Sequence, residues 1–204
     1  MTGRIPILDI APVISCGAYP AKAVVGESFS VSATVFREGH DAVGATVVLC
    51  DPKGKRRQVV HMTRTGPAHL DRWSADVTPD APGMWSFTVE GWSDPVATWR
   101  HNAEIKVEAG IDVELMLTEG ALVLERAASA LPRGRGEVRK RIRAALRVLR
   151  DKHLPAQVRL AAAFDRDITA ALAADPLRDL VTEEGPFPLL VERERALYGS
   201  WYEF

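Results

Sequence analysis

The sequence has few of the features that would point directly to a catalytic site. It contains 2 cysteines and 5 histidines in 204 residues, and the histidines recur at no spacing that suits a metal site. No GxSxG motif, phosphate-binding loop or GxGxxG after a strand is present. Glu183 and Glu184 are adjacent carboxylates in a polar linker, whereas glycoside chemistry needs two carboxyl groups that face each other across a cleft. We therefore predict no catalytic residue, no metal and no cofactor in this chain.

Charge and hydropathy exclude further classes of protein. The formal net charge is −1, so no overall field favours nucleic acid or an anionic membrane. No apolar run approaches the roughly 20 residues that a membrane-spanning helix needs, and Pro6 and Asp9 interrupt the N-terminal apolar residues, unlike in a signal peptide. Cys16 and Cys50 lie in strand-like runs and favour reduced thiols in the core over a disulfide. These features predict a cytoplasmic protein without nucleic-acid or membrane partners.

The first half of the chain alternates between apolar and polar residues. In "SFSVSATVFRE", the side chains of Phe29, Val31, Ala33 and Val35 fall on one face, which is typical of a strand buried on one side. The same period recurs in "ATVVLCDP", "QVVHMTR", "RWSADVTP", "MWSFTVEGW" and "WRHNAEIKVE", with turn residues between the runs. Short strands at such regular spacing predict an antiparallel, immunoglobulin-like β-sandwich over residues 1–109.

From about Gly110 the pattern becomes helical. Asp112 is a candidate N-cap for "VELMLTEGALVLERAASAL", and "LPRGRG" then breaks the helix. An apolar stripe runs through "EVRKRIRAALRVLRDKH", Pro155 suits the first turn of "AQVRLAAAF", and Asp165 can cap "RDITAALAA". Short, closely linked helices favour a small antiparallel bundle, which we expect as an insertion over residues 110–186.

The last stretch returns to alternation. "LLVERERALYGSWYEF" predicts a final strand within residues 187–204 that rejoins the sandwich. Chain ends seldom carry such apolar weight unless they are tied down. We therefore expect the chain to be a fragment, and a domain that follows it to be contacted by Trp201, Tyr202 and Phe204.

Two further stretches are candidates for binding. "GWSDPVATWRH" places Trp92 and Trp99 around a proline loop beside Arg100 and His101, and an exposed indole can stack on the C–H face of a sugar. We favour the alternative, in which both indoles pack into the sandwich or against a neighbouring domain. Residues 133–152 hold nine Lys or Arg against two acids. Without aromatic support this run favours a solvated helix face, or one that pairs with acids across an interface, over a nucleic-acid site.

Four stretches together resemble one family: "AKAVVGESFSVSATVFREGHDAV", "WSDPVATWRH", "PLRDLV" and "PLLVERERALYGSWYEF". They are similar to the N-terminal part of bacterial α-1,4-glucan:maltose-1-phosphate maltosyltransferases of the α-amylase clan. The resemblance runs from about residue 4 to 204 and is loose between about 129 and 159. It implies a β-sandwich with an inserted helical domain, a homodimer, and a catalytic (β/α)₈ barrel that follows and holds the catalytic residues.

The resemblance also implies substrates for the whole enzyme. It would transfer maltosyl from α-maltose-1-phosphate to the non-reducing end of an α-1,4-glucan. The residues here would support dimerisation and packing against the barrel, and would be inactive alone. The alternative is an α-glucan-binding sandwich module that grips its ligand through Trp92 or Trp99.

Overall fold

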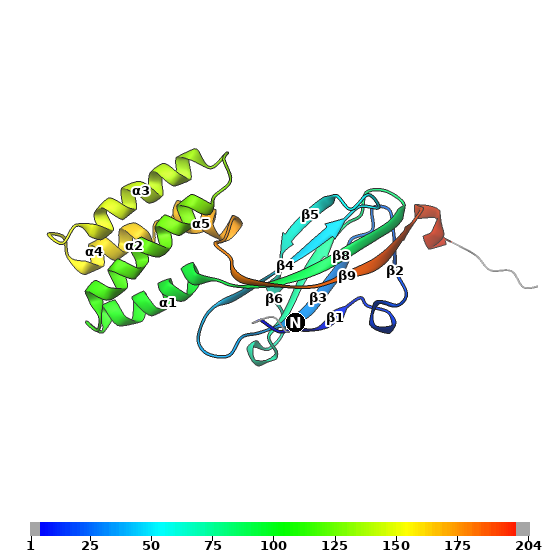
Figure 1. The fold of residues 1–204 in the computed structure, drawn as a ribbon, viewed down its shortest axis with the longest axis horizontal. Coiled ribbons are helices and arrows are strands. Elements are labelled where there is room, and N and C mark those ends of the chain that lie inside the picture. Colours follow the sequence, from blue (N-terminus) through cyan, green and yellow to red (C-terminus); the bar gives the residue numbers. More distant parts are fainter. Residues whose placement is uncertain (1–4, 199–204) are drawn as a thin grey trace, which may run out of the picture. The chain divides into compact units, whose positions relative to one another are not determined.

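The computed structural model describes residues 5–198, which fall into two compact units (Figure 1). The β unit comprises residues 5–38, 43–93 and 180–198 of the described part, and the helical unit comprises Gly39–Ala42 and Asp94–Asp179. The chain therefore leaves the β unit after Ser93 and re-enters it at Leu180.

The strands of the β unit form two sheets. The four-stranded sheet has the order β1-β3-β7-β6 and the five-stranded sheet the order β2-β9-β8-β4-β5. β2 pairs with β9 in parallel, whereas β1–β3, β3–β7, β6–β7, β4–β5 and β4–β8 pair antiparallel. The strands are β1 Ile7–Ala11, β2 Ala21–Val24, β3 Phe29–Val35, β4 Val43–Cys50, β5 Arg56–His61, β6 Thr63–Arg64, β7 Arg72–Val77, β8 Gly83–Ser93 and β9 Asp179–Glu192. Short 3₁₀ helices occupy Ser15–Gly17, Ala68–Leu70 and Glu194–Tyr198.

Both sheets contribute to one apolar core. Val31 and Val35 of β3 enter it from the four-stranded sheet, and Phe87 of β8 and Leu189 of β9 enter it from the five-stranded sheet. The predicted alternation of β3 is confirmed, because Val31, Ala33 and Val35 are fully buried while Ser32 and Thr34 between them are not. Burial on alternate residues is what a strand packed on one face requires.

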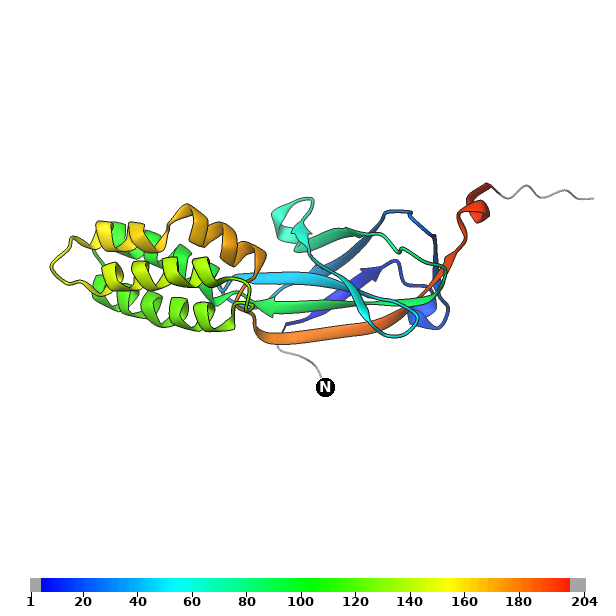
Figure 2. The same cartoon turned by 90° about the horizontal axis from the view of Figure 1, so that it is seen from above.

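The helical unit has five helices and a core of its own. The helices are α1 Pro95–Glu108, α2 Val113–Ala130, α3 Gly136–Arg150, α4 Ala156–Ala163 and α5 Arg166–Ala174, and they lie alongside one another (Figures 1 and 2). The apolar stripe predicted for α3 is buried at Ile142, Ala145, Leu146 and Leu149. Asp165 caps α5 as predicted, because its carboxylate accepts from the backbone N–H groups of Asp167 and Ile168 at 3.0 and 3.1 Å.

The strand predicted for "WRHNAEIKVE" is wrong, because these residues belong to helix α1. Asp94 begins the helix by accepting from the Ala97 amide at 2.8 Å, and Pro95 occupies the first helical position, where its missing N–H costs nothing. The buried side chains Val96, Trp99, Ala103 and Val107 follow helical spacing. The compact units accordingly begin and end at other residues than the domains expected from the sequence.

The final strand also differs from its prediction. β9 runs over Asp179–Glu192 and so includes "TEEGPFP", which the sequence suggested as a linker. Glu194–Tyr198 form a 3₁₀ helix instead of continuing the strand, and residues 199–204 lie outside the described part. The expected return to the β unit nevertheless occurs, since β9 lies between β2 and β8 (Figure 1).

Two local expectations fail as well. Asp112 precedes α2 but takes a left-handed conformation with φ 51°, and its side chain caps no amide. The carboxylate instead accepts from the Lys106 ammonium at 3.0 Å. Cys16 and Cys50 are unpaired, as expected, but Cys16 is exposed on a 3₁₀ turn and is no core residue.

Candidate functional site

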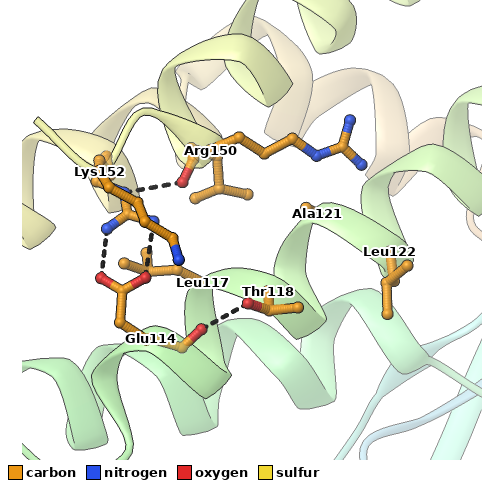
Figure 3. A pocket seen from close by; sticks show the side chains of 9 residues that line it. Glu114, Leu117, Thr118, Ala121, Leu122, Arg150 and Lys152 are labelled. Carbon is orange, nitrogen blue, oxygen red and sulfur yellow. Dashed lines mark hydrogen bonds and ion pairs between the residues drawn. The ribbon is translucent and has the colours of Figure 1, made fainter. Parts of the chain in front are cut away.

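A hollow with charged walls lies within the helical unit (Figure 3). Its volume is about 280 Å³, and α2 supplies one wall while the end of α3, the following loop and α4 supply the other. The lining residues are Glu114, Leu117, Thr118, Ala121, Leu122, Leu149, Arg150, Lys152 and Arg159. Leucine and alanine form the apolar part of the surface, and the charged side chains surround it.

Arg159 is the buried charge of this site, with 4% of its surface exposed. Its Nη1 and Nη2 atoms donate to the two carboxylate oxygens of Glu114 at 2.5 and 3.2 Å. Its Nε donates at 2.9 Å to the carbonyl of Leu149, in the last turn of α3, where carbonyls have no partner within the helix. A buried guanidinium is tolerated because these charge-assisted bonds replace the water it has lost.

Glu114 lies in the first turn of α2 and remains exposed. The hydrogen bond from Arg159 lowers the pKa of its carboxyl group; partial desolvation opposes this, and the charges of Arg159 and Lys152 add to the lowering. Glu114 is therefore ionised at neutral pH. Lys152 makes no hydrogen bond or ion pair with any residue from 5 to 198, and Arg150 pairs with Glu125 at 2.7 Å.

These groups are suited to binding. Apolar walls with a few charged groups at the rim are the usual make-up of a ligand pocket. The lining contains no hydroxyl or thiol beside a histidine, so no activated nucleophile is assembled there. Across the part of the chain that the structure describes, no group of three His, Cys, Asp or Glu side chains could hold a metal ion.

The two tryptophans predicted as contacts are buried. Trp92 belongs to β8 of the β unit, is 5% exposed, and donates its indole N–H to the Thr46 hydroxyl at 3.0 Å. Trp99 belongs to α1 of the helical unit, is 4% exposed, and donates to the Met116 carbonyl at 2.7 Å. Neither ring offers a free face of the size that stacking on a sugar requires. The packing interpretation is thus the better supported, and glucan binding through these rings stays an untested prediction.

Of the other candidate contacts, Arg100 and His101 are neighbours on helix α1. Arg100 lies over the Phe164 ring, 4.5 Å from its centroid, and donates to the Thr169 hydroxyl at 2.5 Å. Partial burial lowers the pKa of its guanidinium, against the opposing charges of Glu104 and Asp94. His101 is exposed on α1. Trp201, Tyr202 and Phe204 lie outside the described residues.

Several basic side chains of residues 133–152 form ion pairs with acids of the helical unit itself. Its guanidinium groups reach carboxylates on α2, on α5 and at the end of α5. The pairs are Arg135–Asp175 at 2.6 Å, Arg141–Asp167 at 2.9 Å and Arg150–Glu125 at 2.7 Å. Arg139 donates to carbonyls of the α2–α3 connection, among them that of Leu131. Three of the nine basic residues of this run thus pair with acids elsewhere in the helical unit.

Sequence reasoning missed Glu114 and Arg159, and it singled out Lys152 only as the last residue of the basic run 133–152. A signal existed only for Arg159, which is the basic residue in the apolar run "AQVRLAAAF" and lies four residues before the buried Ala163. Its partner is 45 residues away, which no local pattern reveals.

No helix within residues 5–198 has both the length and the apolar character needed to cross a bilayer. The described residues thus define a mixed β and α protein, with two sheets around a common core and a helical unit that contains a pocket lined partly by charged side chains.

The comparison with family models shows the family of this chain. The model of α-1,4-glucan:maltose-1-phosphate maltosyltransferase, domain N/S, matches residues 3–193. The chain belongs to this family.

Curated relatives carry the same enzyme name. Alpha-1,4-glucan:maltose-1-phosphate maltosyltransferase 1 of Streptomyces coelicolor is 59% identical over 204 residues, which cover 100% of this chain and 30% of the relative. The enzyme of Arcanobacterium haemolyticum is 46% identical over 98% of this chain and 29% of its own length. That of Mycobacterium tuberculosis is 41% identical, covering 98% and 32%. The chain therefore spans about a third of the length of the curated relatives it matches.

Proposed function

We propose that these residues form the non-catalytic N-terminal region of an α-1,4-glucan:maltose-1-phosphate maltosyltransferase. The observation that carries the proposal is the match of nearly the whole chain to a model described as domain N/S, together with the small share of each relative that the chain covers. The complete enzyme would transfer maltosyl from α-maltose-1-phosphate to an α-1,4-glucan, with its catalytic residues in a separate barrel.

A direct assay tests this division of labour. Phosphate release from α-maltose-1-phosphate in the presence of glycogen is measured for this chain and for a longer protein that carries the catalytic barrel. We expect release by the longer protein and none above the blank by this chain. Release by residues 1–204 alone would overturn the proposal.

The path of the chain supports a finer description of the two units, which fits the same function. We infer an immunoglobulin-like sandwich in the β unit and an inserted domain in the helical unit. The inference is supported by the chain path, which leaves the β unit after Ser93 and returns through β9 between β2 and β8. An insertion of this kind lets the helical unit serve as a contact surface without disturbing the sheets, because the unit has its own core.

Dimerisation and packing against the barrel are the roles we propose for these surfaces. The helical unit exposes several large apolar side chains to solvent, of which Leu115 and Leu122 lie two turns apart on α2 and are 52% and 57% exposed. Exposed apolar groups that gather on one face mark interaction surfaces. We expect Leu115→Asp with Leu122→Asp to shift the longer protein from dimer to monomer in light scattering. The control is Lys140→Glu, an exposed charge change on α3. A dimer that is unchanged by the double substitution would contradict the role of α2.

A further inference from the structure

The cations that line the pocket of the helical unit outnumber its carboxylates, and not all of these cations pair with an acid among residues 5–198. Three cations and one carboxylate line it, a difference of +2, and Glu125 outside the lining pairs with one of the cations. Lys152 makes no hydrogen bond or ion pair among residues 5–198. A lysine held at the edge of a hollow beside a buried arginine is an arrangement that attracts an anion.

The carboxylate of Glu114 covers the two Nη atoms of Arg159 from the solvent side. The side chain of Arg159 is 5% exposed and that of Glu114 is 58% exposed, so Arg159 is fixed while Glu114 has room to rotate away. Lys152 lies beside Glu114, near Leu117, in the lining of the pocket (Figure 3). An anion that took the place of the Glu114 carboxylate would meet a buried guanidinium and a free ammonium together.

We propose that this pocket binds a small phosphate monoester. The phosphate replaces the Glu114 carboxylate on Arg159 and is bound by Lys152, while the organic group rests on Leu117 and Ala121. The ligand is small, since a volume of about 280 Å³ is close to the lower end of the ligand pockets of proteins, roughly 300 Å³. This site goes beyond the proposed function and does not rest on it.

The competition with Glu114 selects phosphate over carboxylate. Glu114 is tethered, so its effective concentration at Arg159 is on the order of millimolar or above. A free carboxylate would make the same two bonds and gain little. A phosphate monoester carries a charge of about −1.5 to −2 at neutral pH and has three acceptor oxygens, so it can bind Arg159 and Lys152 at once.

Titration calorimetry with phenyl phosphate tests the site in the intact chain. The pH is about 7.5, above the second phosphate pKa of about 6, so that the ligand is a dianion. We expect saturable binding at millimolar concentrations or below. Lys152→Met weakens it about tenfold, the usual worth of one charge-assisted hydrogen bond. Glu114→Gln strengthens it several-fold, because the competing charge is gone.

Lys140→Met is the matched control, because Lys140 is an exposed lysine on α3 that does not line the pocket. We expect it to leave the affinity within about twofold, and far-UV circular dichroism to show that all variants remain folded. The proposal is overturned by the absence of saturable binding, or by equal losses in Lys152→Met and Lys140→Met. Benzoate that binds as tightly as phenyl phosphate overturns the choice of phosphate. Inorganic phosphate that binds as tightly overturns the role of the apolar wall.

Discussion

Replacing Gly120 by alanine tests the packing of the helical unit with a prediction whose sign opposes helix propensity. Gly120 lies inside α2, where alanine would ordinarily stabilise a helix by about 1 kcal/mol. Here a Cβ atom would lie 2.1 Å from Cζ2 and 2.4 Å from Cε2 of Trp99. Carbon atoms pack at about 3.5–4.0 Å. The indole would therefore have to move by more than about 1 Å.

The structure gives Trp99 little freedom to move. Its indole N–H donates to the Met116 carbonyl at 2.7 Å, and its ring meets Phe164 edge-on with 5.8 Å between centroids. Overpacking of this kind costs about 1–3 kcal/mol, and loss of the indole hydrogen bond adds about 1–3 kcal/mol. After the gain of about 1 kcal/mol in helix propensity, we expect Gly120→Ala to lower the free energy of unfolding by about 1–5 kcal/mol.

Urea unfolding followed by circular dichroism at 222 nm measures this change. Gly136→Ala is the control, because Gly136 begins α3 and a Cβ there meets nothing within 4 Å. It should be neutral or stabilising by up to about 1 kcal/mol. The double variant Gly120→Ala, Trp99→Leu should lose less free energy of unfolding than the two single variants lose together. The reason is that replacing the indole by leucine removes the clash that the new Cβ atom causes. Stabilisation by Gly120→Ala equal to that of Gly136→Ala would refute the close contact.

Four further outcomes follow from other contacts in the structure. Asp94→Ala should destabilise the helical unit by about 1 kcal/mol in thermal melts, whereas Asp94→Asn should be nearly neutral because it keeps the N-cap acceptor. Burial raises the pKa of the Asp94 carboxyl group above 3.8. The contribution of this group to stability is therefore present below pH 3.8 and is lost as the pH rises through the raised pKa. Thermal melts of Asp94→Asn should lack this dependence on pH. The pKa of the Glu114 carboxyl group is lowered from 4.5. Its contribution to stability is therefore present above pH 4.5 and is lost as the pH falls through the lowered pKa. The stability of Glu114→Gln should depend less on pH in this acidic range. In the β unit, a Cβ atom on Gly44 would lie 2.3 Å from the ring of Trp92. Gly44→Ala should therefore lower the free energy of unfolding by about 1–3 kcal/mol, measured by urea unfolding followed by tryptophan fluorescence. A change near zero would contradict the contact.

Local periodicity predicted most elements because one-sided burial leaves a pattern in the sequence. The alternation through β3 and the apolar stripe of α3 are both buried as expected. α1 was mistaken for a strand because Trp99–Glu108 alternates well enough by itself, and the deciding signals were Asp94 and Pro95 just before it. The missed end of β9 has a similar cause, since the alternation continues past Glu192 although the strand does not.

The candidate site could not be predicted, because its parts are distant in the sequence. Arg159, Glu114 and the Leu149 carbonyl come from three helices, and their hydrogen bonds exist only once α2, α3 and α4 have packed. The buried state of Trp92 and Trp99 is equally a property of packing, since the sequence alone allowed exposed rings.

By itself, the sequence determined which side of β3 and of α3 is apolar, since periods of 2 and 3.6 residues place side chains on fixed faces. It also carried the family resemblance that the family match confirmed. Only the tertiary structure decided that β9 inserts between β2 and β8, and that Arg159 is buried against Glu114. The physical reason is that strand pairing and ion pairing between distant segments depend on how whole elements pack, which no local pattern encodes.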